Sequence, residues 1–409
     1  MQATLGKRGD TVNNANEAFG PLKFRDDGTF QIAVFEDLHF GENAWDSWGP
    51  QQDINSVRVM NTILDTEDPD LIVLNGDLIT GNNAFLENAT AYVDEIVAPL
   101  VARGLTWAST YGNHDSDFNL SRQALWARES LWPNSRTGNM VAGEDGQQQP
   151  QAGITNYYLP VYGSSCGPSC MPALILWFFD SRGGQSYQQL DADGNTVPQP
   201  CWVDESVVAW FRSTREALSA AWEGRVIPSL AFVHIPVAAA QALQVEDGVS
   251  PAFQPGVNDD VPLAAQGQGW CANGTVGCAY GGQDVPFMEA LVETEGLMGV
   301  FSGHDHGDTW CYKWDGTTPS LNLPGNGLNL CFGQHTGYGG YGHWIRGSRQ
   351  ILVTEAQLQL PLQDLAVDTW IRTEDAGVVG SVTLNSTYGL DVYAETPNED
   401  TFCPTCIYS

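Results

Sequence analysis

The chain has 409 residues, and 42% of them are hydrophobic, so it can bury a large core. It contains 17 Lys and Arg against 49 Asp and Glu, which gives a formal net charge of −32. Such an acidic surface repels polyanions, which argues against nucleic-acid binding through a basic face. No apolar run approaches the roughly 20 residues that a membrane-spanning helix needs, so we expect no membrane insertion.

The first two strand-like runs are each followed directly by a polar motif. The apolar run at residues 30–35 predicts a buried strand, and it leads into Asp37-Leu38-His39. Apolar residues at helical spacing between 54 and 64 predict a helix. The next strand is predicted at residues 71–74, which run into Gly76-Asp77. The chain therefore begins as alternating strands and helices.

The same arrangement recurs further along the chain, after a helix that we predict over about residues 85–102. Three more strands and their motifs are residues 105–110 before Gly112-Asn113-His114-Asp115, residues 229–233 before His234, and residues 297–301 before Gly303-His304-Asp305-His306. Strands alternating with helices build an α/β sheet, whose ligand sites lie at the carboxyl ends of the strands. Five such ends predict one metal site.

Beyond residue 309 the sequence predicts short strands separated by glycine-rich turns. Strands predicted at 351–353, 380–384 and 389–392 would pair antiparallel and complete a second sheet. Because the motifs between residues 37 and 306 must meet, we expect one catalytic domain. The predicted division is an N-terminal arm at 1–25, the domain at 26–396 and a C-terminal tail at 397–409.

The five motifs in this order resemble the signature of the calcineurin-like metallophosphoesterase superfamily. Three further segments resemble a small plant and fungal branch that is related to purple acid phosphatases: residues 178–181, 230–236 and 328–333. The resemblance extends from about residue 30 to about residue 353. It implies a two-sheet β-sandwich flanked by helices, with the metal site at the C-terminal ends of strands.

The resemblance also implies a set of ligands for two metal ions. Asp77 would bridge the ions, which together activate water and neutralise phosphoryl oxygens. The remaining ligands would be Asp37, His39 and His306 for one ion and Asn113, His234 and His304 for the other. Mn, Zn, Fe or Mg could each bind to such nitrogen and oxygen ligands.

Thr80 departs from the pattern of the purple acid phosphatases. Those enzymes carry a tyrosine three residues beyond the bridging aspartate, and its bond to ferric iron gives their colour. Thr80 stands at that position here. We therefore expect a colourless protein.

His114 is the predicted general acid for the leaving oxygen, a task suited to an imidazole. Its alternative role is that of an additional metal ligand. Asp115 is grouped with it as a catalytic residue, either because it orients His114 or because it braces the loop. Both roles of Asp115 stay open at this stage.

Four residues are candidates for contact with the substrate. His335 and Tyr338 belong to a glycine-rich segment, residues 334–343, which could border the site or form a turn at a sheet edge. Arg122 and Arg182 could clamp a phosphate in this arginine-poor chain, with surface ion pairs as the alternative.

Nine cysteines indicate an oxidising compartment. The expected disulfides are Cys166–Cys170, Cys271–Cys278, Cys311–Cys331 and Cys403–Cys406, which leaves Cys201 as the odd thiol. The alternative for Cys403 and Cys406 is a redox or zinc pair. Candidate glycosylation sites are Asn88, Asn119, Asn273 and Asn385. No signal peptide is visible at Met1, so either it has been removed or the protein is intracellular. The cysteines favour the first, and we expect a secreted protein.

Together these features predict a secreted, dinuclear-metal phosphoric-ester hydrolase of a small phosphorylated substrate. By family likeness it would be a phosphomonoesterase that uses a metal-bridging hydroxide as nucleophile. A phosphodiesterase on the same site is the first alternative. A non-catalytic binding protein on this scaffold is the second, and the oligomeric state is left open.

Overall fold

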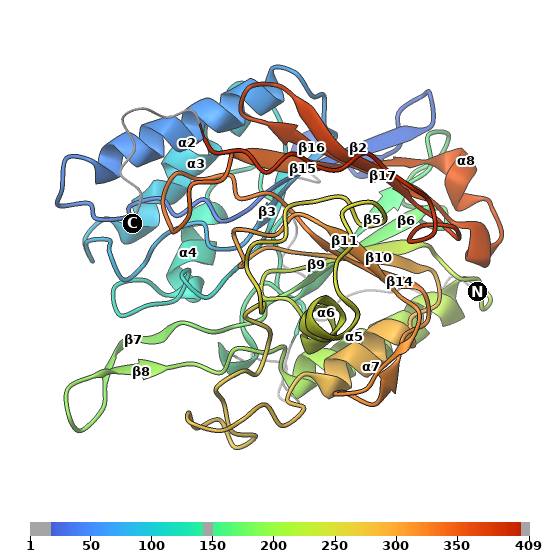
Figure 1. Ribbon diagram of the computed structural model, residues 1–409. Coiled ribbons are helices and arrows are strands. Elements are labelled where there is room, and N and C mark those ends of the chain that lie inside the picture. The colour runs from blue at the N-terminus through green and yellow to red at the C-terminus, as the bar shows by residue number, and fades with distance from the viewer. Residues whose placement is uncertain (1–17, 142–149, 402–409) are drawn as a thin grey trace.

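The computed structural model describes residues 18–141 and 150–401. Two β-sheets pack face to face, and helices cover their outer sides (Figure 1). One sheet has six strands in the order β17-β16-β15-β2-β3-β4, and the other has seven in the order β1-β5-β6-β9-β10-β14-β11. The predicted two-sheet α/β sandwich is thus confirmed.

The six-stranded sheet joins the beginning of the described chain to its end. Its strands are β2 (Thr29–Phe35), β3 (Leu71–Asn75), β4 (Trp107–Thr110), β15 (Gly347–Thr354), β16 (Val367–Thr373) and β17 (Val378–Leu384). Strands β2, β3 and β4 are parallel, with Val34 beside Val73 and Val73 beside Ala108. Strand β15 runs antiparallel to β2, and β16 and β17 continue the antiparallel part.

The seven-stranded sheet has a parallel centre formed by β6, β9, β10 and β14. Its strands are β1 (Leu22–Lys23), β5 (Tyr157–Tyr162), β6 (Leu174–Phe179), β9 (Ser229–Val233), β10 (Leu297–Ser302), β11 (Cys311–Trp314) and β14 (Leu328–Phe332). Two hairpins lie outside the sheets: β7 (Gln185–Leu190) with β8 (Thr196–Pro198), and β12 (Thr317–Thr318) with β13 (Leu323–Pro324). The β7–β8 hairpin extends from the body of the molecule (Figure 1).

Helices lie on the two outer faces (Figure 1). On the side of the six-stranded sheet they are α2 (Gly49–Leu64), α3 (Tyr92–Ala102) and α4 (Arg122–Glu129). On the side of the other sheet they are α5 (Glu205–Ala221), α6 (Ala238–Ala242) and α7 (Val285–Val292). Helix α8 (Glu355–Leu358) follows β15 and begins with a capping box at Thr354. Short 3-10 or π turns are Ala89–Ala91, Pro150–Ala152, Leu243–Asp247 and Leu362–Asp364. No helix in the described ranges is long and apolar enough to cross a membrane.

Successive side chains of the central strands pack on opposite faces of their sheet, and both faces are buried. In β9, Leu230 and Phe232 enter the core between the two sheets, while Ala231 and Val233 pack on the helix side. In β2, Val34 belongs to the core between the sheets and Phe35 packs with α2 and α3. Because both faces of these strands are buried, most of their positions are apolar. Rigid strands of this kind fix the positions of the motifs that follow them.

Three sequence predictions differ from the structure. The helix predicted from residue 85 begins at Tyr92, after a turn and a 3-10 turn. The strand predicted at 389–392 is wrong: the segment is irregular, and Leu390 and Val392 are 79% and 76% exposed. Strand β1 pairs with β5, so the predicted N-terminal arm contributes to the sheet from Leu22 onward.

Three predicted disulfides are present: Cys166–Cys170, Cys271–Cys278 and Cys311–Cys331. Cys311 lies directly opposite Cys331 in the antiparallel pair of β11 and β14, as predicted for a disulfide that joins two strands. Cys201 is the free thiol of the described residues, and Cys403 and Cys406 lie outside them.

The four candidate glycosylation sites differ in exposure. Asn88 and Asn273 are exposed, while Asn119 and Asn385 are half-buried. The Asn119 amide donates to the Ala84 carbonyl at 3.0 Å, and the Asn385 side chain accepts from the backbone of Thr387 at 2.9 Å. Asn88 and Asn273 are therefore the more accessible pair.

Candidate metal centre

The five predicted motifs meet at the carboxyl ends of the parallel strands. Asp37 and His39 follow β2, and Asp77 follows β3. His234 follows β9 in the other sheet, and His304 and His306 follow β10. The backbone ties neighbouring ends together, since the Asp37 N–H donates to the Gly76 carbonyl at 3.1 Å and the Gly303 N–H to the His234 carbonyl at 3.0 Å.

Four of these residues have left-handed backbone conformations. The φ angles are 52° at Asp37, 48° at His39, 47° at Asp77 and 78° at His304. Non-glycine residues in this region carry strain of about 1–3 kcal/mol each, and such strain concentrates at functional sites. The sharp turns aim all four side chains from the strand ends into one space.

The first cluster consists of Asp37, His39 and His306, whose ligand atoms lie within 4.8 Å of one another. All three side chains are buried. The Nε2 atoms of His39 and His306 are 3.2 Å apart, and His306 Nε2 is 3.5 Å from Asp37 Oδ1. Two imidazole nitrogens that face each other beside a carboxylate are suited to sharing one cation.

The second cluster consists of Asp77, His234 and His304, again with ligand atoms within 4.8 Å of one another. His234 Nε2 lies 3.0 Å from Asp77 Oδ2. A Cβ atom on Gly112 would lie within 2.6 Å of both Asp77 and His234, so this glycine lets the loop approach closely. The loop thereby brings the next residue, Asn113, to the second cluster.

Asn113 offers an acceptor that the protein leaves unused. Its buried Oδ1 has no hydrogen-bond partner among the described residues. A buried acceptor without a partner costs about 1–3 kcal/mol, so an amide oxygen is rarely left in this state. The predicted role of Asn113 as a metal ligand fits this observation.

Asp77 lies between the two clusters. Its Oδ2 atom is 3.0 Å from Nε2 of His234 and 3.9 Å from Nε2 of His39, so a single oxygen faces both. Asp37 Oδ1 lies at a comparable distance from the second cluster, 3.8 Å from His234 Nε2. The other oxygen of Asp77 accepts the His114 N–H at 2.7 Å. This geometry suits the bridging role that the sequence predicts for Asp77.

Three of the candidate ligands have pKa values that favour the form a metal ion binds, a charged carboxylate or a neutral imidazole. Burial raises the pKa of Asp77, but His234 and His114 outweigh it and hold that pKa well below its usual range. Burial lowers the pKa of His39 well below its ordinary value and that of His304 to about 4. His234 is the exception, because Asp77 outweighs burial and raises its pKa to about 10. A divalent ion would compete with that proton.

Hydrogen bonds on the outer side hold three imidazoles in place. Nδ1 of His234 bonds with the Asn75 carbonyl at 2.9 Å, and Nδ1 of His306 with the Tyr341 carbonyl at 2.9 Å. Nδ1 of His39 lies 3.0 Å from the hydroxyl of Thr80. Each contact leaves Nε2 facing the centre, which is the arrangement of ligating histidines. Thr80, at the position of the absent tyrosine, thus positions a candidate ligand.

The glycine-rich segment covers the first cluster. A Cβ atom on Gly340 would lie 2.5 Å from His306 Cε1 and 2.9 Å from His39 Cδ2. The neighbouring Tyr341 ring stacks on the His306 ring, with centroids 4.0 Å apart. The segment at residues 334–343 therefore borders the site, which was one of its two predicted roles; the other was a turn at a sheet edge. The sequence predictions named His335 and Tyr338 within this segment and missed Gly340 and Tyr341. The pair Gly339-Gly340 could have indicated that the backbone passes close to another part of the protein.

His335 and Tyr338 do not have the surroundings of substrate-binding residues. The buried His335 ring lies against His306, with Nε2 bonded to the Gly339 carbonyl at 3.1 Å and Nδ1 to Arg346 at 2.9 Å. The Tyr338 hydroxyl bonds with Glu374 and Thr401, away from the clusters. His335 supports a candidate ligand, and Tyr338 anchors the segment.

The two arginines are placed differently from phosphate clamps. Arg122 is buried, donates to the carbonyls of Gly112 and Gly183, and lies 3.3 Å from Asp180. Arg182 is also buried and pairs with Asp204 at 3.0 Å while donating to the Trp202 carbonyl. Both guanidiniums are held by backbone carbonyls and carboxylates; the Arg122–Asp180 pair is buried, whereas Asp204 in the other pair is partly exposed. Arg122 instead braces the loop that carries Asn113.

Asp115 braces the same loop, which corrects its grouping as a catalytic residue. One oxygen accepts the N–H groups of Leu78 and Ile79, and the other accepts the N–H of Gly112. Its side chain is fully buried, and the hydrogen bonds to its two oxygens come from these backbone groups and not from the His114 ring. The half-buried His114 ring lies 5.0 Å from the His39 ring, measured between centroids, at the edge of the clusters.

The chain is similar to a protein family and to several known proteins. The family model for the calcineurin-like phosphoesterase matches residues 30–308. The chain is 28% identical to a "probable inactive purple acid phosphatase 14" of Arabidopsis thaliana, over 87% of this chain and 83% of that protein. It is 25% identical to "phosphatase DCR2" of Saccharomyces cerevisiae, over 76% of this chain and 49% of that protein. A dimetal phosphatase structure from Danio rerio is 13% identical, with a TM-score of 0.48, over 87% of this chain and 99% of that one.

Proposed function

This chain belongs to the calcineurin-like phosphoesterase family, and from that membership we propose that it is a secreted hydrolase of small phosphate monoesters that depends on two metal ions. The observation that carries the proposal is the pair of adjoining histidine–carboxylate clusters. Asp37, His39 and His306 would hold one ion, and His234, His304 and Asn113 the other. Asp77, whose Oδ2 faces both clusters, would bridge them.

Two divalent ions bound there would activate water and neutralise the charge of the phosphoryl oxygens. Mn, Zn, Fe and Mg all suit these ligands. Thr80 cannot supply a tyrosinate ligand, so the proposal includes a colourless protein. The neutral Asn113 limits the negative charge that faces an anionic substrate.

His114 is the proposed general acid. Its N–H donates to Asp77 at 2.7 Å, which fixes its backbone beside the bridging carboxylate. Its ring is half-buried, so it can be reached from outside. A proton delivered from this ring would let an alkoxide leave as the alcohol.

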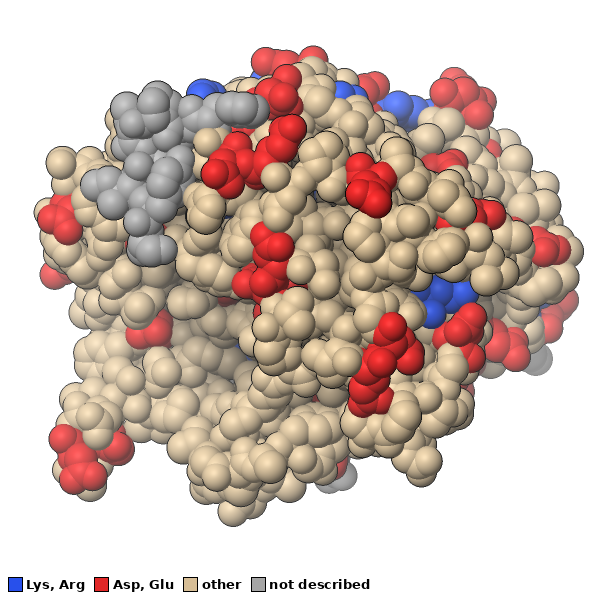
Figure 2. Space-filling model, viewed as in Figure 1, with Lys and Arg blue, Asp and Glu red and all other residues tan. Residues whose placement is uncertain are grey.

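The acidic surface bears on the kind of substrate. Acidic side chains are spread over the face in Figure 2 and basic ones are few, in keeping with the net charge of −32. Long-range repulsion acts more strongly on a polyanion than on a small phosphate ester. Three disulfides support an extracellular location, because such bonds persist in oxidising compartments.

The test compares p-nitrophenyl phosphate with bis(p-nitrophenyl) phosphate, with elemental analysis of the same purified protein. We expect about two metal ions per chain and faster hydrolysis of the monoester. Faster hydrolysis of the diester would make the protein a phosphodiesterase. Two bound ions without hydrolysis of either ester would make it a binding protein on this scaffold, a role consistent with relatives that are named probable inactive phosphatases.

A further inference from the structure

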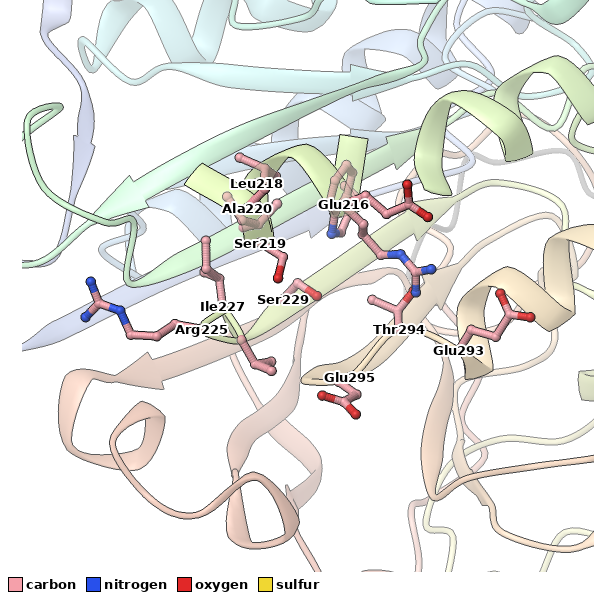
Figure 3. Close-up of a pocket in the computed structure, with 14 residues that line it drawn as sticks. Glu216, Leu218, Ser219, Ala220, Arg225, Ile227, Ser229, Glu293, Thr294 and Glu295 are labelled. Carbon is pink, nitrogen blue, oxygen red and sulfur yellow. The ribbon is translucent and has the colours of Figure 1, made fainter. Parts of the chain in front are cut away.

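A cavity lies near the beginning of β9, at the end of that strand opposite to the metal centre. Its volume is about 450 Å³, and it opens between α5, the start of β9 and the segment after α7 (Figure 3). Ser229 lines it at the first residue of β9, whereas His234 follows the last. At about 3.3 Å per residue, five residues of strand separate the cavity from the metal centre by roughly 16 Å.

Three residues that line the cavity each carry a polar atom without a hydrogen-bond partner in the part of the chain that the structure describes; these atoms are covered by protein, so a ligand would reach them through a small movement of the cavity wall. The buried Trp177 Nε1, Ser229 Oγ and Arg215 Nε atoms have no hydrogen-bond partner among the described residues. Trp177 and Ser229 are each only 2% exposed. Each unsatisfied buried polar group costs about 1–3 kcal/mol, and three of them at one cavity are unusual.

The chemistry of these groups limits what can satisfy them. An indole N–H and a guanidinium N–H donate and never accept, so the missing partner must supply an acceptor. Arg215 is half-buried and already donates to Thr294 at 2.6 Å through another nitrogen. Its flexible side chain forms part of the wall and can turn Nε towards an acceptor. Figure 3 shows the side chains of Ser219 and Ser229 near one another and Arg225 directed away from them.

The rest of the lining is apolar inside and acidic at the edge. Ile175 is buried, and Leu218, Val226 and Ile227 are partly exposed. Glu216 and Glu295 are exposed at the rim, and Glu293 pairs with Arg212 at 3.0 Å. Apolar walls with a few convergent polar groups, in a volume of this size, are typical of small-molecule sites.

We propose that this cavity binds a small amphipathic molecule whose apolar body lies against Ile175, Leu218 and Ile227 and whose carboxylate or similar acceptor receives hydrogen bonds from Arg215, Trp177 and Ser229. The site is separate from the metal centre, and the proposal does not depend on the activity of that centre.

The test uses decanoate as the probe, with decanol and decylamine as molecules that share its chain and differ in the head group. Binding to the full chain is measured by isothermal titration calorimetry. We expect saturable binding of decanoate with one site per chain, weaker binding of decanol and no binding of decylamine. The absence of saturable decanoate binding up to 1 mM (roughly the weakest affinity of a specific site), or equal binding of decylamine, would overturn the proposal.

Variants separate this cavity from other apolar surfaces. Ser219→Phe fills the cavity from α5 and should abolish decanoate binding, whereas Ala221→Phe adds the same ring at an exposed position of that helix and should not change it. Arg215→Met keeps a long side chain without the donor and should weaken decanoate binding by about tenfold, which corresponds to roughly one lost hydrogen bond to a charged group. Circular dichroism and thermal unfolding establish that each variant is folded. Unchanged decanoate binding in folded Ser219→Phe would place the probe elsewhere and overturn the proposal.

Discussion

The two histidine–carboxylate clusters differ in how they are covered. The cluster of Asp37, His39 and His306 is buried, lies beneath Gly340 and is packed against the Tyr341 ring. In the second cluster, His304 is half-buried, and half-buried Asn113 and His114 lie on the loop beside it. The glycine-rich segment thus closes one side of the centre and leaves the other more accessible.

This difference indicates that the covered cluster mainly holds its metal ion, while the more exposed side admits the substrate. A side chain stacked between neighbours holds its ligand nitrogen firmly but gives little access to a substrate. The partly exposed loop with Asn113 and His114 offers the route by which a leaving group could reach a proton donor. Asp77 belongs to the second cluster and also faces His39 of the first, so the effects of substitutions should rank by how many clusters they disturb.

Asp77→Asn should have the largest effect. The substitution removes the negative charge that faces both His39 and His234, so both sites should lose affinity together. We expect loss of most bound metal and of nearly all turnover, beyond the roughly 10–100-fold effects of residues that only support ligands. Elemental analysis and steady-state rates measure this, with Asp193→Asn at an exposed hairpin position as the control. Full metal content with intact turnover would refute the bridging role.

His114→Ala should disturb the open side alone. If His114 is the general acid, both ions stay bound while turnover of an alkyl phosphate falls by roughly 10²–10⁴-fold. The loss should be much smaller with p-nitrophenyl phosphate, because p-nitrophenolate leaves almost without a proton. His304→Ala, which removes a candidate ligand, should depress both substrates together and release metal. Equal losses accompanied by metal release in the His114 variant would make His114 a ligand.

Gly340→Ala should disturb the closed side alone. The new methyl group would press on His306 and His39, so we expect a 10–100-fold loss of affinity for one ion and retention of the other. Gly327→Ala is the matched control, because Gly327 also has a positive φ, of 91°, but has open space around the added atom. Equal effects of the two substitutions on metal content would show that backbone strain, and not contact with the imidazoles, is responsible.

The candidate ligands could be predicted from the sequence because each lies in a short motif directly after an apolar strand. Five strand ends at one edge of a sandwich leave little freedom in where Asp37, Asp77 or His304 can point. The supporting contacts are of another kind, since they join residues far apart in the chain. Nothing local to Arg122 indicates that it donates to the Gly183 carbonyl, and nothing local to Asp115 indicates that it accepts from the backbone of Leu78.

The glycine-rich segment illustrates the same limit. Its composition predicts a loop near the site, but a loop has no periodicity that tells which side chain faces inward. Tyr338 and Tyr341 both lie among glycines in this segment. The Tyr338 hydroxyl nevertheless bonds with Glu374, whereas the Tyr341 ring stacks on His306. The prediction of a strand at 389–392 failed for a related reason. Four residues that alternate between apolar and polar also occur in exposed loops without a partner strand.

Thr80→Val should give the smallest effect of the series, again on the closed side. Valine keeps the shape of threonine but removes the hydroxyl that lies 3.0 Å from Nδ1 of His39. The imidazole would then lose one orienting contact while Asp37, His306 and Asp77 remain, so we expect about a tenfold loss of affinity for the ion of the first cluster, at the low end for such supporting residues. Thr80→Ser restores the hydroxyl and should restore the affinity, which distinguishes the hydrogen bond from packing. The measurement is a titration of the metal-free protein with Mn²⁺ or Zn²⁺. Unchanged affinity in Thr80→Val together with a loss in Thr80→Ser would show that the methyl group of Thr80, and not its hydroxyl, supports His39.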